Sequence, residues 1–209
     1  MTTRPFTPRQ SELAAILAGR QTLILRPFKP QPPHHTWNCY NTGGFNVKTS
    51  GDQRAKCPLG APGDLLWIKE KYTIECPYGP PEGCENPDHV WLWQDEVARD
   101  YFATRWRPAI TMPRWASRHT LRVLDVREIQ VQDITEYDAC AAGIQGHSHT
   151  TGKSNPRTVF VAFPELDGGF LRAVHALEAQ WNTIYGEQGW GLPWGINPWA
   201  WACEFEVVR

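Results

Sequence analysis

This chain of 209 residues has a formal net charge of -1, and 41% of its residues are hydrophobic. Its length is in the range of one domain and its apolar content suffices for an ordinary core, which excludes a disordered or fibrous protein. Because the chain has neither an apolar run long enough to span a membrane nor a hydrophobic segment near Met1, we expect a soluble, cytoplasmic protein that does not bind membranes.

The first predicted elements are a helix and a strand that follows it directly. Ser11 is a suitable N-cap and Gly19 a suitable C-cap for a helix over residues 10–19. The β-branched and leucine residues of 22–26 predict a strand, which Pro27 ends.

Four later segments have the composition or the period-two alternation of strands. They are residues 65–74, 90–93, 119–131 and 197–208. In the last segment Trp199 alternates with its neighbours in the way that core residues do, and so does Trp201.

Two later helices are predicted over residues 133–143 and 170–184. Thr135 is the predicted N-cap of the first, and Gly143 its end. The second is amphipathic, and the side chains expected to face the core are Leu171, Val174, Leu177 and Trp181.

The order of these elements indicates an α+β fold. The segments 29–62 and 145–158 are rich in polar and turn-forming residues and predict long loops. Strands separated by long loops and a few helices favour a small β-barrel flanked by helices.

The charges are segregated along the chain. Lys and Arg outnumber Asp and Glu by eight to two in residues 1–60 and by five to none in 101–122, whereas the acidic residues lead by nine to three in 61–100 and eleven to five in 123–209. If the two basic segments meet in the fold, they form a positive surface that can neutralise phosphates. Composition equally allows them to pair with the acidic segments.

The six cysteines are expected to be reduced thiols, because the chain is long and shows no secretion signal. One spacing suggests a metal site: Cys76, Cys84 and His89, with Cys57 or Cys39 as the fourth ligand. Structural zinc sites use short ligand spacings, and the chain has no CxxC pair. We therefore expect neither a bound metal nor a cofactor.

Eleven tryptophans are an unusual number for this length. Trp37, Trp190 and Trp194 lie in loops rich in Gly and Pro, so they are candidates for stacking on bases. Indole faces accept any base, and arginine adds a cation–π attraction.

Six blocks of the chain, taken in order, resemble the successive blocks of the ASCH superfamily. They are residues 17–26, 62–70 (Pro-Gly-Asp-Leu-Leu-Trp-Ile-Lys-Glu), 121–126, 133–136 and 197–205, together with Met-Pro-Arg-Trp-Ala-Ser-Arg at 112–118. The block at 112–118 is similar to one in the long form found in phages and prophages.

The resemblance extends from residue 13 to the C-terminus. It implies a single domain over residues 1–209 with a PUA-like small β-barrel. The implied core blocks are 13–28, 62–74, 117–144 and 197–208, and the implied insertions are 29–61, 75–116 and 145–196.

The resemblance also implies a phage or prophage protein that binds nucleic acid, above all RNA, or a modified nucleobase. Small relatives in the superfamily deacetylate N4-acetylcytidine with a trio of Lys, Thr and Glu, and others cut RNA. The matching positions here hold Gln21, Ile24 and Ala142. None of these supplies a nucleophile, a proton or a charge, so a binding module is favoured over an enzyme.

Two alternatives remain open. The first is a hydrolase acting on a modified nucleoside, or a ribonuclease, with a rearranged catalytic site at Thr22, Lys69 and Glu70. The second is a phage inhibitor that binds a host protein through the long loops.

Arg26, at the end of the first strand, is expected to contact a phosphate or a base edge in the implied cleft. The alternative is an ion pair with Glu70 or Asp64. Lys69 and Glu70 alternate along one predicted strand, so only one of them can face the cleft. Glu70 is the predicted one, accepting a hydrogen bond from a base amino group.

Arg114, Trp115, Ser117 and Arg118 form a basic cluster with an indole inside it and no acidic residue nearby. RNA-binding proteins combine base stacking with phosphate contacts through such residues. The alternative is that Trp115 fills the core while the arginines cap a strand.

Overall fold

The computed structural model describes residues 1–31, 57–75, 90–92, 106–149, 157–161, 169–186 and 189–208. The main sheet consists of β1 (Thr3–Phe6), β2 (Leu23–Pro27), β3 (Leu65–Ile68), β6 (Thr120–Gln130) and β9 (Trp199–Val208). Its order is β1-β3-β6-β9-β2, with β1 parallel to β3 and every other neighbouring pair antiparallel. The fold is therefore mixed α/β, with few helices around one large sheet.

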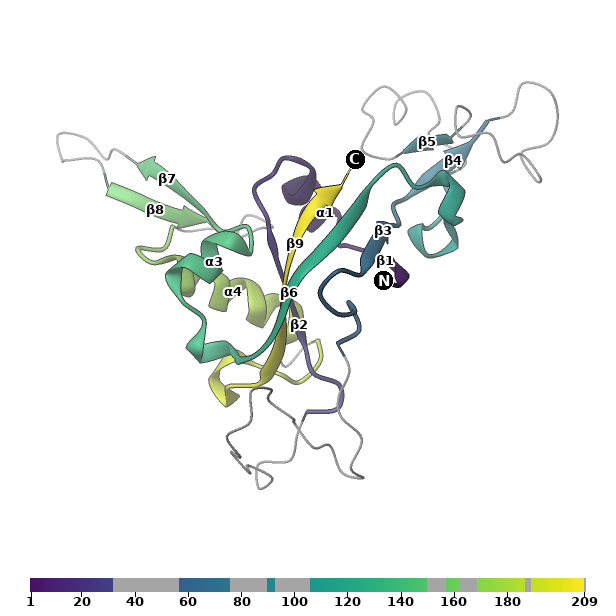
Figure 1. Ribbon diagram of the computed structural model, residues 1–209. Helices are drawn as coiled ribbons and strands as arrows, with labels where there is room; N and C mark the ends of the chain where they lie inside the picture. Colours follow the sequence, from purple (N-terminus) through teal and green to yellow (C-terminus); the bar gives the residue numbers. More distant parts are fainter. Residues whose placement is uncertain are drawn as a thin grey trace.

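Two smaller sheets extend from opposite sides of the main sheet (Figure 1). One pairs β4 (Tyr72–Ile74) with β5 (Val90–Leu92), and the other pairs β7 (Gln145–His149) with β8 (Arg157–Val161). Both pairs are antiparallel.

The α-helices of the described residues are α1 (Gln10–Leu17), α3 (Glu136–Ala141) and α4 (Ala173–Tyr185). The predicted N-cap of α3 is confirmed, because the Thr135 hydroxyl accepts a hydrogen bond from the Asp138 amide at 3.2 Å. The N-cap of α1 is Arg9 and not Ser11 as predicted. The Glu12 carboxylate accepts the Arg9 amide at 3.0 Å, which starts the helix earlier.

One core lies between the main sheet and α1, and we call it the α1 core. All five strands of the main sheet contribute to it. Its buried members are Phe6, Leu13, Ile16, Ile24, Phe28, Cys57, Leu59, Leu66, Ile68, Leu121, Val123, Trp201, Cys203 and Phe205.

A second core, the α4 core, lies between α3, α4 and the β2–β9 part of the sheet. Its buried members are Leu23, Leu25, Val131, Ile134, Ala139, Ile144, Ala173, Ala176, Leu177, Trp181, Tyr185, Trp194, Ala200 and Ala202. Successive residues of a strand point to opposite faces, so β2 directs Ile24 into one core and Leu25 into the other. The same alternation places Trp201 in the α1 core and Ala202 in the α4 core.

Three segments differ from the predicted elements. The strand expected over 65–74 divides into β3 and β4, because the charged residues 69–71 interrupt it and β4 pairs with β5. The loop expected over 145–158 contains β7 and the first residues of β8. The short strand β1, which contains Pro5, had no strand signal in the sequence and is held by pairing with β3.

The helix expected over 170–184 begins later, at Ala173. Leu171 therefore lies outside the helix and is 68% exposed, contrary to the prediction, while Leu177 and Trp181 are buried as predicted. The three cysteines that the structure describes, Cys57, Cys140 and Cys203, are free thiols. Across the described ranges, no helix has the length and apolar character needed to cross a membrane.

The two leucines of β6 test the position of the α1 core. Leu121 is completely buried, whereas Leu124 is 49% exposed beside a register shift between Val123 and Asp125. Leu121→Ala should lower the free energy of unfolding by about 2–5 kcal/mol, because it leaves a cavity. Leu124→Ala, the matched control, should change it by less than about 1 kcal/mol. Urea denaturation measures both, and equal losses would contradict this arrangement.

Candidate functional site

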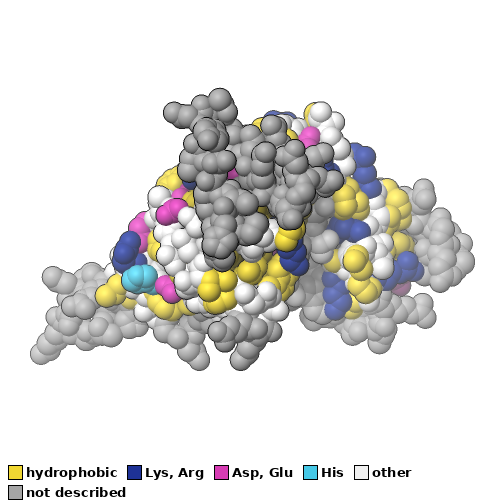
Figure 2. All heavy atoms as spheres, turned by 90° about the horizontal axis from the view of Figure 1, so that it is seen from below, with side chains coloured by type: hydrophobic (Ala, Val, Ile, Leu, Met, Phe, Trp, Pro, Cys, Tyr) yellow, Lys and Arg dark blue, Asp and Glu magenta, His cyan; other side chains and the backbone are white. Residues whose placement is uncertain are grey.

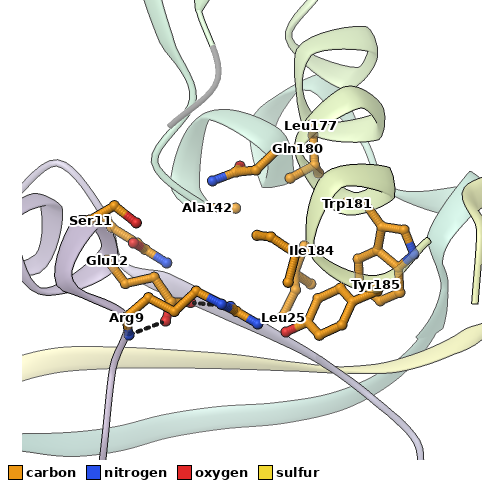
Figure 3. A pocket seen from close by; sticks show the side chains of 11 residues that line it. Arg9, Ser11, Glu12, Leu25, Ala142, Leu177, Gln180, Trp181, Ile184 and Tyr185 are labelled. Carbon is orange, nitrogen blue, oxygen red and sulfur yellow. Dashed lines mark hydrogen bonds and ion pairs between the residues drawn. The ribbon is translucent and has the colours of Figure 1, made fainter. Parts of the chain in front are cut away.

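A cleft opens beside the edge strand β2, where side chains of α1 and α4 face each other (Figure 3). We call it the α1–α4 cleft. Its lining residues are Arg9, Ser11, Glu12, Gln21, Leu25, Ala142, Leu177, Gln180, Trp181, Ile184 and Tyr185. The centre of a water molecule can lie anywhere within about 40 Å³ of the cleft. This is room for about three waters. The cleft is therefore narrow, with a polar side on α1 and a largely apolar side on α4.

Glu12, one of the residues that line the cleft, forms a bidentate ion pair with Arg26, which does not itself line the cleft. The Arg26 guanidinium donates to the two oxygens of the Glu12 carboxylate at 2.7 and 2.8 Å, and it also donates to the Leu25 carbonyl at 2.9 Å. The pair is mostly buried, with 18% of the Arg26 and 11% of the Glu12 side chain exposed. The alternative considered for Arg26 was an ion pair with Glu70 or Asp64, whereas the acid that pairs with it is Glu12.

The charges of this pair are stabilised in the fold. Burial is the largest single influence on Glu12 and raises the pKa of its carboxyl. The charge and hydrogen bonds of Arg26, together with those of Arg9, outweigh burial, so the net pKa of Glu12 is lowered. Burial likewise opposes the charge of Arg26, but Glu12 raises its pKa above the ordinary value. Both groups are charged at neutral pH.

Tyr185 stands at the opposite wall and is almost completely buried, with 3% of its surface exposed. Its ring lies 5.0 Å from the Arg9 guanidinium and 4.6 Å from the Trp181 ring. Its hydroxyl is close enough to Arg26 to help raise the pKa of that guanidinium. The hydroxyl nevertheless has no hydrogen-bond partner of ordinary geometry among the described residues. A buried hydroxyl in this state costs about 1–3 kcal/mol, so it calls for a water or a ligand atom.

The structure brings together two of the three positions that the ASCH resemblance singles out. Gln21 and Ala142 both line the α1–α4 cleft although they are far apart in the chain. The Thr22 amide donates to the Ala141 carbonyl at 2.9 Å, which holds the end of α3 beside Gln21. The third position, Ile24, is fully buried in the α1 core and does not line the cleft.

The alternative trio of Thr22, Lys69 and Glu70 is not brought together. Thr22 precedes β2, whereas Lys69 and Glu70 follow β3, and β6 and β9 lie between those strands. Three strand spacings amount to about 14 Å along the sheet. Lys69 donates to the Ile110 carbonyl, and Glu70 is buried beside Met112, whose sulfur accepts its amide at 3.2 Å.

Along β9, the register separates Arg26 from the basic cluster at 114–118, although the contact of Arg26 with Phe6, which pairs with Ile68, brings the two regions closer through space. Arg26 is opposite Trp201 on β9, whereas Thr120, two residues after Arg118, is opposite Val208. Seven residues of strand span about 23 Å. Figure 2 shows Lys and Arg interspersed with hydrophobic side chains toward this end of the molecule, to the right in that view.

Within that cluster the four residues have different environments. Arg114 and Arg118 are exposed, and Trp115 packs partly buried against the apolar cluster around Tyr72 and Met112. The Ser117 hydroxyl donates to the Ile68 carbonyl at 2.7 Å, which fixes the segment to the end of β3. The two arginines thus form an exposed surface over a fixed base, which we call the Arg114–Arg118 surface.

The structure also bears on the predicted stacking tryptophans and metal ligands. Trp194 is buried in the α4 core, so the prediction that it stacks on bases is wrong. The metal candidates Cys76, Cys84 and His89 lie outside the described residues, as do Cys39 and Trp37. No group of three metal-binding side chains occurs in the part of the chain that is described.

Glu128 is a further carboxyl with an altered pKa. Burial raises its pKa to about 7. It lies on β6 opposite Trp201, on the face of the α1 core, and it does not line the α1–α4 cleft.

Sequence reasoning missed Arg9, Glu12 and Tyr185. A glutamate in the first turn of a helix belongs to the capping-box pattern and could have pointed to Glu12, but arginine is not a usual N-cap residue, so Arg9 gave no such signal. Tyr185 continues the series Leu177 and Trp181 at four-residue spacing, so it belongs to the same helix face.

Comparison with known protein families, with curated proteins and with solved structures found no match. What the cleft can bind must therefore follow from its own chemistry.

The Arg26–Glu12 pair can be tested by replacing its acid. Glu12→Gln leaves the Arg26 charge buried without compensation, so it should lower the free energy of unfolding by about 3 kcal/mol, the lower end for a broken buried pair. The matched control is Glu206→Gln, which breaks the exposed pair that Glu206 forms with Arg122 at 2.8 Å. That change should cost less than about 1 kcal/mol in urea denaturation.

The cost of Glu12→Gln should also depend on pH. The pKa of Glu12 is lower in the folded protein than its unfolded value of 4.5. Its contribution to the free energy of unfolding is therefore fully present above pH 4.5 and is lost as pH falls through the folded pKa. The stability difference between wild type and Glu12→Gln should therefore be constant from pH 7 to pH 5 and shrink below pH 4.5. A difference that grows on acidification would contradict the ion pair.

Proposed function

We propose that this chain is an ASCH-like module with a PUA-like small β-barrel, and that its α1–α4 cleft binds a base of single-stranded RNA or a modified nucleobase. The observation that carries the proposal is the buried Tyr185 hydroxyl, which lines the cleft. Its contact with Arg26 falls short of an ordinary hydrogen bond, and because a guanidinium only donates, the hydroxyl proton has no acceptor among the described residues.

The shape of the sheet supports the barrel part of the proposal. Every strand of the main sheet contributes to the α1 core, as expected for a sheet that curls around one interior. The Arg26 guanidinium of β2 lies 5.6 Å from the centre of the Phe6 ring of β1, so the two edge strands approach each other. In the described residues no backbone pairing joins these edges.

The chemistry of the cleft supports a planar polar ligand. The apolar residues Leu25, Leu177 and Ile184 offer surface for the face of a ring. The Tyr185 hydroxyl and the Glu12 carboxylate offer a donor and an acceptor for the edge of a base. Because a nucleobase combines an apolar face with a polar edge, it fits this division better than a purely ionic or aliphatic ligand.

The cleft is better suited to binding than to hydrolysis. Glu12 is held in an ion pair and its pKa is lowered, so it is a poor proton donor at neutral pH. Gln21 and Ala142, the cleft residues at positions of the superfamily's catalytic trio, have no acid–base or nucleophilic group. These observations favour recognition of a base without chemical change.

The Arg114–Arg118 surface complements the cleft in this proposal. Exposed arginines attract phosphates without regard to sequence, whereas the cleft reads one base. The two sites would therefore contribute separately to RNA binding, one in a salt-dependent way and the other through the identity of the base.

Tyr185→Phe tests the cleft with the smallest change. It keeps the ring that Arg9 and Trp181 contact but removes the hydroxyl. We expect the affinity for a nucleoside, screened with cytidine and N4-acetylcytidine by calorimetry, to fall about 5- to 10-fold, the effect of one hydrogen bond.

Stability distinguishes this role from a structural one. In the free protein the Tyr185 hydroxyl makes only a weak contact with Arg26, so Tyr185→Phe should change the free energy of unfolding by less than about 1 kcal/mol. Tyr137→Phe, at a tyrosine that is 78% exposed on α3, is the control and should alter neither property. If wild type binds neither nucleosides nor single-stranded RNA at low salt, the proposed function is wrong.

The basic surface is tested by the double change Arg114→Ala and Arg118→Ala. On a single strand, each arginine that contacts a phosphate adds about 0.7 to the slope of log affinity against log salt, so the slope for single-stranded RNA should fall by about 1.4. Nucleoside affinity should stay unchanged.

The control is Arg122→Ala with Arg172→Ala, which removes two exposed arginines outside the Arg114–Arg118 surface, where they pair with Glu206 and Glu136. It should change the slope less. Equal slopes for the two double variants would show that residues 114–118 have no particular role.

A further inference from the structure

A second hollow lies beside the α1–α4 cleft, between the segment after β2 and the turn after α4. It is open and broad, with a volume of about 440 Å³, and its walls include Phe28, Lys29, Gln31, Trp190 and Leu192. The two sites share one aromatic contact: the ring of Tyr185, in the cleft, meets the ring of Trp190, in the hollow, edge to face at 5.3 Å.

Cations and aromatic rings form a continuous row across both sites. The Arg9 guanidinium lies 5.0 Å from the Tyr185 ring centre, and the Lys29 ammonium lies 3.0 Å from the Trp190 ring centre. The order along the row is therefore cation, ring, ring, cation. Grooves for single-stranded nucleic acid combine such rings, which stack on bases, with cations that follow the backbone.

The wall that carries Trp190 is fixed by backbone hydrogen bonds. The Gly186 carbonyl accepts the amides of Trp190 and Gly191 at 3.1 Å each, and the Tyr185 carbonyl accepts the Leu192 amide at 2.8 Å. The indole is nevertheless 47% exposed. An aromatic ring held in place at the surface loses little conformational entropy when a base stacks on it.

The wall that carries Lys29 is fixed as well. The Gln31 side chain donates to the Phe28 and Trp199 carbonyls at 3.1 and 2.9 Å and accepts the Trp199 amide at 2.8 Å. Phe28 in turn stacks on Trp201 at 4.3 Å. The residues on both sides of Lys29 are therefore held in place.

We propose that the hollow is a second subsite, which stacks the base of the nucleotide next to the one in the α1–α4 cleft on Trp190. This inference rests on the proposed function of the cleft. The 5.3 Å between the Tyr185 and Trp190 ring centres is comparable with one to two base steps of about 3.4 Å. The base takes the place of the Lys29 ammonium over the indole, and the ammonium neutralises the phosphate between the two nucleotides. The ligand is then a two-nucleotide step of a single strand.

The test compares a nucleoside with a dinucleoside monophosphate that contains it, by calorimetric titration of the full chain. Wild type should bind the dinucleotide about 5- to 100-fold more tightly, the effect of one base–aromatic stack. Trp190→Ala should abolish this gain while changing nucleoside affinity much less, and Trp190→Phe should keep part of the gain. Trp91→Ala, at another exposed tryptophan, is the matched control and should keep all of it. Thermal unfolding shows that each variant is folded.

The outcomes separate the two proposals. Nucleoside binding that depends on Tyr185, without any gain for the dinucleotide, would overturn the second subsite and leave the cleft's function standing. A gain that survives in Trp190→Ala would overturn the subsite as well. Dinucleotide binding that needs Trp190 while nucleosides do not bind would support the hollow but contradict the cleft. Binding of neither ligand would overturn both.

Discussion

The ion pair between Arg26 and Glu12 is the interaction on which both the edge of the sheet and the α1–α4 cleft depend. It ties α1 to β2 through two hydrogen bonds, at 2.7 and 2.8 Å. Arg26 also contacts Phe6, so the same side chain connects the two edge strands of the sheet. Because the pair is mostly buried, neither charge can lose its partner without a large cost, and α1 is held where it forms one wall of the cleft.

The position of the cleft follows from the two cores on either side of the sheet. β9 is the second strand from the β2 edge and has apolar side chains on both faces, with Ala202 in the α4 core and Cys203 in the α1 core. Among the described helices, α1 packs on one core and α3 and α4 on the other, and α1 and α4 face each other beside β2. The edge of β2 that no described strand pairs with lies there, and polar groups from both sides gather around Tyr185 and Glu12.

In the proposed function, the same arrangement would separate two kinds of contact with a nucleic acid. In the cleft, charges are fixed by their partners, and the proton of the buried Tyr185 hydroxyl has no acceptor among the described residues, which suits recognition of a single base edge. Toward the other end of β9, Arg114 and Arg118 are exposed over a segment that Ser117 fixes to β3. The row from Arg9 through Tyr185 and Trp190 to Lys29 extends the cleft along a second direction. We propose that these surfaces together hold one strand.

The sequence by itself determined the elements that depend on neighbours along the chain. Thr135 could be recognised as the cap of α3, and the alternation around Trp201 as a buried strand, because each signal comes from residues a few positions apart. The mixed class of the fold followed from the order of such elements. The partner of Arg26, the pairing of β1 with β3 and the pairing of β7 with β8 could not be predicted in this way. Only the tertiary structure decided them, because several partners suit an arginine or a short strand, and long-range packing selects one. It also placed Gln21, Ala142 and Tyr185 around one cleft, since their distance in space depends on how both cores pack.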